Sequence, residues 1–108
     1  LGLSNTLRGA MASWSKSLSR ELHPCITINN VLPGFTDTER LGSLADSINQ
    51  KTGKSIDEIH DGWMSQVPIQ RLVDPLETAS AITFLALPSS GAIRGVSLAV
   101  DGGRLRGI

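Results

Sequence analysis

The stretch Ile26-Thr27-Ile28-Asn29-Asn30-Val31-Leu32-Pro33-Gly34 decides the fold of this 108-residue chain. Its short β-branched and apolar run, residues 26–32, is bounded by prolines on both sides, which is typical of a buried strand. Before it, apolar residues recur every three or four positions over residues 3–22, and the proline at position 24 ends this helical period. A strand directly after a helix predicts an α/β unit.

A second helix and strand follow near the end of the chain. Asp74 as N-cap, Pro75 at the first helical position and Glu77 at the third predict a helix over residues 74–87. Residues 96–100 are an apolar run closed by an Asp-Gly-Gly turn, which predicts the last strand. This order favours a parallel sheet with helical crossovers. Because two strands leave both sheet edges open, we expect further strands from residues outside this chain or from another chain.

Between these two units, residues 34–67 are polar and broken but carry helix-start signals. Thr36 with Glu39, and Ser55 with Glu58, match the capping-box pattern, so we expect two short helices in a mobile loop. Thr52-Gly53-Lys54-Ser55 has the form of the end of a phosphate-binding loop, but Ile48 stands where that loop requires its first glycine. We interpret this tetrapeptide as a coincidental sequence before a helix cap.

The composition excludes several classes of protein. Ten Lys and Arg balance ten Asp and Glu and are scattered, which argues against a nucleic-acid partner. No apolar run approaches the roughly 20 residues of a membrane span, and no charged-then-apolar leader opens the chain. We therefore expect a cytoplasmic location and no membrane partner. The chain opens on Leu-Gly-Leu with no cap before its first helix, so we expect it to be a piece of a longer protein.

Few residues could hold a metal or form a disulfide. With a single cysteine and two histidines, we expect neither a disulfide nor a metal site, and the acidic residues around His60 are interpreted as a solvated helix face. His23 is expected to interact with the terminal carbonyls of the first helix, and Cys25 to be buried as a small hydrophobe. The chain contains no tyrosine, which excludes a phenolic acid or base within it.

The turn after residues 26–32 is the most informative candidate for ligand binding. Pro33 and Gly34 are followed by the hydroxyl residues Thr36 and Thr38, at the carboxyl end of a strand, where open α/β sheets bind ligands. An ordinary strand-to-helix turn explains the same residues, and both interpretations stay open from the pattern alone.

Four ordered blocks of this sequence resemble the short-chain dehydrogenase/reductase family, in particular reductases of the 3-oxoacyl-acyl carrier protein type. The blocks are Ser17-Leu18-Ser19-Arg20-Glu21-Leu22; Asn29-Asn30-Val31-Leu32-Pro33-Gly34 with Thr38; Pro68 through Arg71-Leu72, Pro75, Glu77 and Phe84-Leu85-Ala86; and Gly95 through Val100-Asp101-Gly102-Gly103. The resemblance implies an α/β fold, the carboxyl-terminal part of a Rossmann-type doubly wound parallel sheet.

The resemblance also implies an organisation for residues 1–108. Residues 1–23 correspond to the catalytic helix, 26–32 to a strand, 36–67 to the substrate lid, 74–87 to a helix and 96–100 to the last strand. The family's glycine-rich dinucleotide loop is not in this chain, so the amino-terminal, nucleotide-binding half of the same subunit is an implied partner.

Counted along the family's pattern, the catalytic Tyr-x-x-x-Lys falls on Ser4 and Arg8. In the family, the lysine lowers the pKa of the phenol and binds the ribose, and the phenol passes a proton to the carbonyl oxygen. A serine hydroxyl is far less acidic, whereas Arg8 keeps the positive charge and can donate to ribose hydroxyls. Alternatively, Ser4 and Arg8 are first-turn helix residues with no chemistry.

The resemblance further implies a cofactor, a substrate and an assembly. NAD or NADP would be bound by Arg8, Pro33, Gly34, Thr36 and Thr38, with Gly34 leaving room for its approach, and mainly by residues outside this chain. The substrate would be a small carbonyl or hydroxyl compound, such as a 3-oxoacyl thioester. Trp63 and Met64 either line its pocket or pack the lid.

The assembly implied is a homo-oligomer, a dimer or tetramer, formed through the last helix and strand. The activity implied is hydride transfer between NAD(P) and the carbonyl or hydroxyl group. The alternative is a non-catalytic family member that serves as a cofactor-binding or structural subunit.

Overall fold

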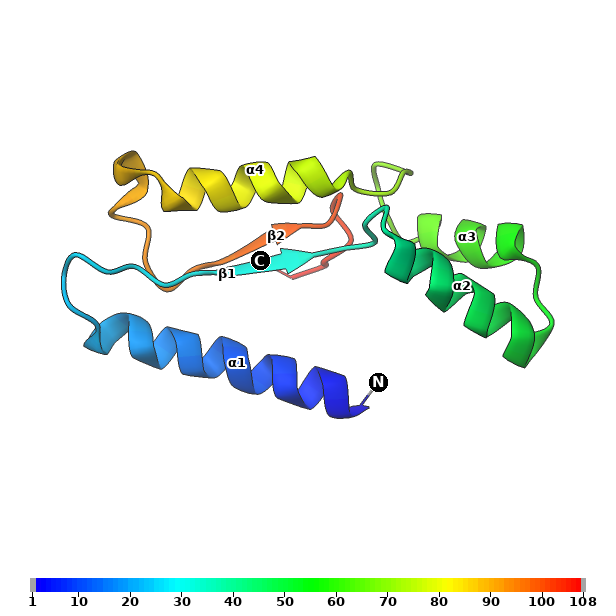
Figure 1. The fold of residues 1–108 in the computed structure, drawn as a ribbon, viewed down its shortest axis with the longest axis horizontal. Helices are drawn as coiled ribbons and strands as arrows, with labels where there is room; N and C mark the ends of the chain where they lie inside the picture. The colour runs from blue at the N-terminus through cyan, green and yellow to red at the C-terminus, as the bar shows by residue number, and fades with distance from the viewer. Residues whose placement is uncertain (1, 108) are drawn as a thin grey trace. The chain divides into compact units, whose positions relative to one another are not determined.

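The strands of this chain pair as a small parallel sheet; one helix precedes the first strand, and the other helices lie between the strands in chain order (Figure 1). The computed structural model describes residues 2–107. The elements are α1 (Gly2–Glu21), β1 (Asn30–Pro33), α2 (Glu39–Thr52), α3 (Ile56–Met64), α4 (Pro75–Ala86), a short 3-10 turn η1 (Pro88–Ser90) and β2 (Ser97–Val100). The α/β class and the parallel sheet expected from the sequence are confirmed. The chain divides into two units, residues 2–32 with 80–98, and residues 33–79 with 99–107.

In the first unit, α1 contacts the strands through its small residues. Ser15 and Ser19 are the buried residues of α1, and the Ser15 hydroxyl donates to Oδ1 of Asn30 at 2.9 Å. Gly95 has a φ of 70°, and a Cβ there would collide with the Ser19 side chain. Glycine is therefore required at position 95 for two reasons, its left-handed backbone and the close approach of α1.

The large apolar residues of α1 lie on another face. Leu3 is 75% exposed and Trp14 is 54% exposed, with Leu7 and Met11 between these values. The apolar period over residues 3–22 correctly predicted the helix, but the face that packs inward in the first unit is the serine face. Small residues allow the close helix-to-strand approach that Ser15 and Ser19 make.

The first strand begins later than predicted, at Asn30 instead of residue 26. The Asn29 side chain occupies the pairing positions before it: its Nδ2 donates to the Ile93 carbonyl at 3.1 Å, and its Oδ1 accepts from the Val96 N–H at 3.0 Å. The backbone still pairs here, since the Gly95 N–H donates to the Ile28 carbonyl at 2.8 Å, but the Asn29 side chain interrupts the regular ladder. The last strand begins at Ser97, and the helix predicted over 74–87 is Pro75–Ala86.

The end of α1 also differs from the prediction. Arg94, and not His23, binds the terminal carbonyls of this helix: its Nη2 donates to Leu22 at 2.5 Å and its Nε to Ser19. The His23 ring instead accepts from the Cys25 N–H through Nδ1 at 3.2 Å, and Cys25 is exposed. A guanidinium has five N–H donors and can bind several carbonyls at once, whereas a histidine ring has one donor, or two when protonated.

In the second unit, α2 and α3 pack together as a helical pair, which confirms the two short helices expected in residues 36–67. Ser55 caps α3, accepting from the Glu58 N–H at 3.1 Å as predicted. Thr38, not Thr36, caps α2, because the Thr36 hydroxyl bonds back to the Gly34 carbonyl at 3.1 Å. Gly53 ends α2 in the left-handed conformation, with a φ of 73°. The glycine of the Thr-Gly-Lys-Ser tetrapeptide is thus a helix stop.

Within residues 2–107, no helix combines the length and the apolar character needed to cross a membrane.

Candidate active site

Ser4 and Arg8 lie one turn apart on the same face of α1, as the spacing predicted. This is the face that carries Ser15 and Ser19 three turns further along. Ser19 lies against Gly95, before β2, and Ser15 bonds to Asn30, at the start of β1. Followed back toward Ser4, the helix therefore runs toward the carboxyl end of β1, the side on which α/β sheets bind ligands.

The two side chains are available for a ligand. Ser4 is half-buried, Arg8 is exposed, and neither makes a side-chain hydrogen bond to any other described residue. A serine hydroxyl offers one donor and two acceptor lone pairs, and a guanidinium offers a planar fork of donors. Together they can bind hydroxyl or carbonyl oxygens, while only the serine can exchange a proton with them.

The turn after β1 is shaped by the turn after β2. The Gly34 N–H donates to the Val100 carbonyl at 3.1 Å, and a Cβ on Gly34 would lie 2.7 Å from Cα of Asp101. Gly34 is therefore required by the neighbouring backbone of Asp101. This is a different reason from the ligand approach expected from the sequence.

Thr36 presents an unpaired backbone. It forms an isolated parallel bridge with Val73, in which the Val73 N–H donates to Phe35 and the Asp37 N–H donates to Val73, both at 2.9 Å. Because successive peptide groups in an extended chain alternate sides, the N–H and C=O of Thr36 itself point away from Val73. Neither makes a hydrogen bond within residues 2–107. A donor and an acceptor side by side match a primary carboxamide.

Thr38 has a structural role, and its predicted contact with a cofactor stays a prediction. Its Oγ1 accepts from the Leu41 N–H at 3.3 Å and caps α2, whose N-terminus carries the positive end of the helix dipole. Its hydroxyl proton is not used in this cap. The first unit contains Ser4 and Arg8, and the second unit contains Pro33, Gly34, Thr36 and Thr38.

Trp63 packs within the second unit. Its ring stacks on Phe35 with centroids 5.2 Å apart and planes at 18°, and the Arg104 guanidinium lies 4.3 Å from the Phe35 ring centre. Of the two interpretations of Trp63, the structure shows packing. Roles for Phe35 and Arg104 were not predicted from the sequence, although an arginine directly follows the Asp-Gly-Gly turn.

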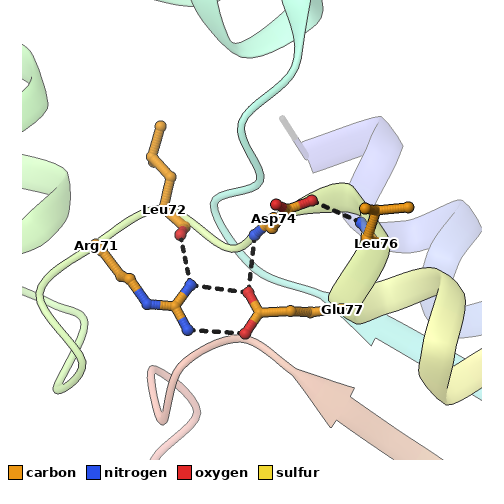
Figure 2. A network of polar contacts seen from close by, with 5 residues as sticks. All are labelled: Arg71, Leu72, Asp74, Leu76 and Glu77. Carbon is orange, nitrogen blue, oxygen red and sulfur yellow. Dashed lines mark hydrogen bonds and ion pairs between the residues drawn. The ribbon is translucent and has the colours of Figure 1, made fainter.

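Figure 2 shows the polar network at the start of α4. Arg71 holds Glu77 with two hydrogen bonds, Nη2 to Oε1 at 2.7 Å and Nη1 to Oε2 at 2.8 Å. Glu77 also accepts from the Asp74 N–H at 2.9 Å, and the Asp74 carboxylate accepts from the Leu76 N–H at 2.8 Å. The hydrogen bond from Arg71, and then that from Asp74, lowers the pKa of Glu77 to about 2. The predicted cap by Asp74 is confirmed.

An open depression lies beside this network, lined by Asp37, His60, Gln70, Arg71, Leu72, Asp74 and Pro75. The charge of Arg71 is already compensated by Glu77, so this depression has no uncompensated guanidinium. In the part of the chain that the structure describes, no three His, Cys, Asp or Glu side chains are grouped so that they could hold a metal ion.

Comparisons with known proteins agree on one family. A family model described as enoyl-(acyl carrier protein) reductase matches residues 3–104. The chain is 37% identical over 97 residues to the 3-oxoacyl-(acyl-carrier-protein) reductase FabG of Vibrio cholerae, covering 89% of this chain and 35% of that protein. It is 33% identical over 100 residues to the short-chain reductase protein NovJ of Streptomyces niveus, covering 92% of this chain and 37% of that protein.

Solved structures of similar fold come from the same family. The crystal structure of YwfH, an NADPH-dependent reductase involved in bacilysin biosynthesis, matches 95% of this chain with a TM-score of 0.86 at 29% identity. The match covers 39% of that structure. This chain therefore spans somewhat more than a third of the length of the proteins that it matches.

Proposed function

Because the chain belongs to the short-chain dehydrogenase/reductase family, we propose that it is the carboxyl-terminal part of a subunit that transfers hydride between NAD(P) and a carbonyl or hydroxyl substrate. A 3-oxoacyl thioester is the substrate class we propose first, since FabG of Vibrio cholerae is a relative. The observation that carries the proposal is the unpaired backbone of Thr36, placed after β1 where this family's nicotinamide amide would be held.

The residues present fit the nicotinamide cofactor. The N–H and C=O of Thr36 offer the donor and acceptor that a carboxamide needs, and the Thr38 hydroxyl keeps a proton to donate. Pro33 and Gly34 shape the turn that presents them, and Arg8 has donors for ribose hydroxyls. When bound, the cofactor would supply or accept the hydride. The pyrophosphate would be held by residues outside this chain.

Ser4 is proposed to orient the substrate oxygen. Its hydroxyl can donate a hydrogen bond to a carbonyl oxygen, but it is too weak an acid to protonate an alkoxide as a phenol does. We propose that a water or another residue supplies the proton through this hydrogen bond. The absence of a phenol also favours the second candidate function, a non-catalytic subunit that binds cofactor or a partner.

Restoring the family's pair in the full-length protein tests the proposal. The double variant Ser4→Tyr with Arg8→Lys should reduce carbonyl compounds faster, since a positioned general acid contributes roughly 10²–10⁴-fold. Ser13→Tyr, at an exposed position of the same helix, is the matched control and should change nothing. If the double variant folds, binds cofactor and stays no faster than the parent, the non-catalytic function becomes the better account.

We also propose a homo-oligomer formed through the last helix and strand. Ile82 and Phe84 on α4 are 53% and 52% exposed, which leaves apolar surface for a stable interface. Phe84→Asp in the full-length protein should lower the mass measured by light scattering. Gln50→Asp, at an exposed position on α2, should not. A parent protein that stays monomeric at all concentrations would contradict this assembly.

A further inference from the structure

The turn that follows β2 is held by hydrogen bonds to its own carboxylate. Both oxygens of the Asp101 carboxylate accept backbone N–H groups, from Gly103 at 3.0 Å and from Leu105 at 2.8 Å. Gly102 and Gly103 have φ values of 65° and 89°, which side chains rarely adopt. The turn over residues 101–104, here called the terminal turn, therefore holds Arg104 in a defined position.

Arg104 joins two segments far apart in the sequence. Its guanidinium lies over the Phe35 ring, and its Nε and Nη2 both donate to Oε1 of Gln66 at 3.3 Å. Phe35 follows β1, and Gln66 lies just after α3. Because Phe35 also stacks on Trp63 of α3, the three contacts connect the terminal turn to the end of that helix.

The segment that leaves α3 is held by the same turn. The Ile69 N–H donates to the Gly102 carbonyl at 3.3 Å, and Val67 is only 3% exposed. A Cβ on Gly102 would collide with the side chains of Ile69 and Val67, and one on Gly103 would lie 3.1 Å from the ring of Pro68. The glycines of the terminal turn thus allow residues 67–69 to pack directly against its backbone.

We infer that the terminal turn anchors the α3 end of the α2–α3 segment and that Arg104 is a positioning residue for the substrate. The inference rests on the proposed function, in which residues 36–67 are the substrate lid. A loosened lid is competent to bind for a smaller fraction of the time, which raises the apparent KM in proportion. The described contacts of the Arg104 side chain are with Phe35 and Gln66, and the positioning role acts through these two residues.

The test replaces Arg104 in the full-length protein. Arg104→Met keeps most of the side-chain length and removes the charge and the planar donors; Arg106→Met, two residues further on, is the matched control. We expect Arg104→Met to raise the KM for the carbonyl substrate about two- to fivefold, because an exposed cation–π contact of this kind contributes about that much. The KM for the cofactor should not change. Arg104→Lys keeps the charge without the fork and should fall between Met and the parent.

The fluorescence of Trp63 tests whether the terminal turn anchors α3 independently of whether the protein catalyses a reaction. The emission of Trp63, obtained as the difference between each protein and its Trp63→Phe version, should shift to longer wavelength in Arg104→Met and not in Arg106→Met. An unchanged Trp63 emission overturns the anchor, and a shifted emission with unchanged substrate KM overturns the positioning role. A protein that turns over no carbonyl refutes the proposed function and with it the positioning role, while the emission still decides whether the terminal turn anchors α3.

Discussion

Replacing Gly34 or Gly42 by alanine is predicted to change the stability of the fold in opposite directions. A Cβ on Gly34 would lie 2.7 Å from backbone and side-chain atoms of Asp101, whereas one on Gly42, inside α2, would meet nothing within 4 Å. We predict that Gly34→Ala lowers the free energy of unfolding, because the backbone at Asp101 must shift. Gly42→Ala should raise it by about 0.5–1 kcal/mol, the helix preference of alanine. Urea unfolding of both variants measures this, and a tolerated Gly34→Ala would contradict the close packing of the two turns.

Glu77 gives the fold a defined dependence on pH. Its pKa in the folded chain is about 2, against a usual value of 4.5, because Arg71 and the Asp74 N–H stabilise its charged form. A lowered folded pKa means that the stabilisation is complete above pH 4.5 and is lost as the pH falls from 4.5 toward 2. Thermal unfolding between these values should therefore show a steeper loss for the parent than for Glu77→Gln.

The control for this prediction is Glu58→Gln, a carboxylate on α3 with no ion pair among residues 2–107. It should keep the slope of the parent. If Glu77→Gln and Glu58→Gln show the same dependence on pH, the network at the start of α4 does not contribute to acid stability.

Individual residues of the candidate site could be predicted only where a single local motif contained them. The positions of Ser4 and Arg8 followed from the resemblance, and the structure confirms that they share a helix face. The unpaired backbone of Thr36 could not be predicted, because it depends on the bridge to Val73, 37 positions further along (73 − 36). The same is true of Gly34, whose constraint comes from Asp101.

Among the elements, α1 depends on a residue far from it in sequence. Arg94 donates to the carbonyls of Ser19 and Leu22 and, at 3.5 Å, to those of His23 and Pro24. Hydrogen bonds of a charged group are worth about 1.5–3 kcal/mol, so Arg94→Ala should destabilise the protein by an amount of that order.

Arg20→Ala is the matched control for Arg94→Ala, since Arg20 lies in the last turn of α1 but is exposed and makes no side-chain hydrogen bond to another described residue. It should change the free energy of unfolding by less than about 0.5 kcal/mol. Equal effects of the two variants in denaturant unfolding would show that Arg94 does not hold the helix end.

The helices were more predictable than the strands. Caps are local signals, so Ser55 and Asp74 predicted their helix starts, and only the choice between Thr36 and Thr38 was wrong. A strand depends on its partner: residues 26–29 have the composition of a strand, but the Asn29 side chain interrupts the regular backbone ladder there, although the Ile28 carbonyl still accepts from the Gly95 N–H. The face of α1 that is buried could not be read from hydrophobicity, because serines pack against β1 and Gly95.

At the scale of the whole molecule, we propose that this chain is part of a nicotinamide-dependent oxidoreductase. The α/β class, the parallel sheet and the family were all predictable, because the family's blocks are spaced along the entire chain. The anchoring of α3 by the terminal turn was not, because it combines residues 35, 63, 66 and 104, which no local pattern connects.

The most direct test of this account is isotope transfer. The full-length protein is supplied with NADH or NADPH deuterated at the reactive ring carbon, together with 3-oxoacyl thioesters and simple ketones, and the products are examined by mass spectrometry. The account predicts an alcohol that carries one deuterium on the former carbonyl carbon, formed more slowly by the parent than by the Ser4→Tyr, Arg8→Lys variant. Cofactor that binds while no product carries deuterium, with the parent or with the variant, would contradict it.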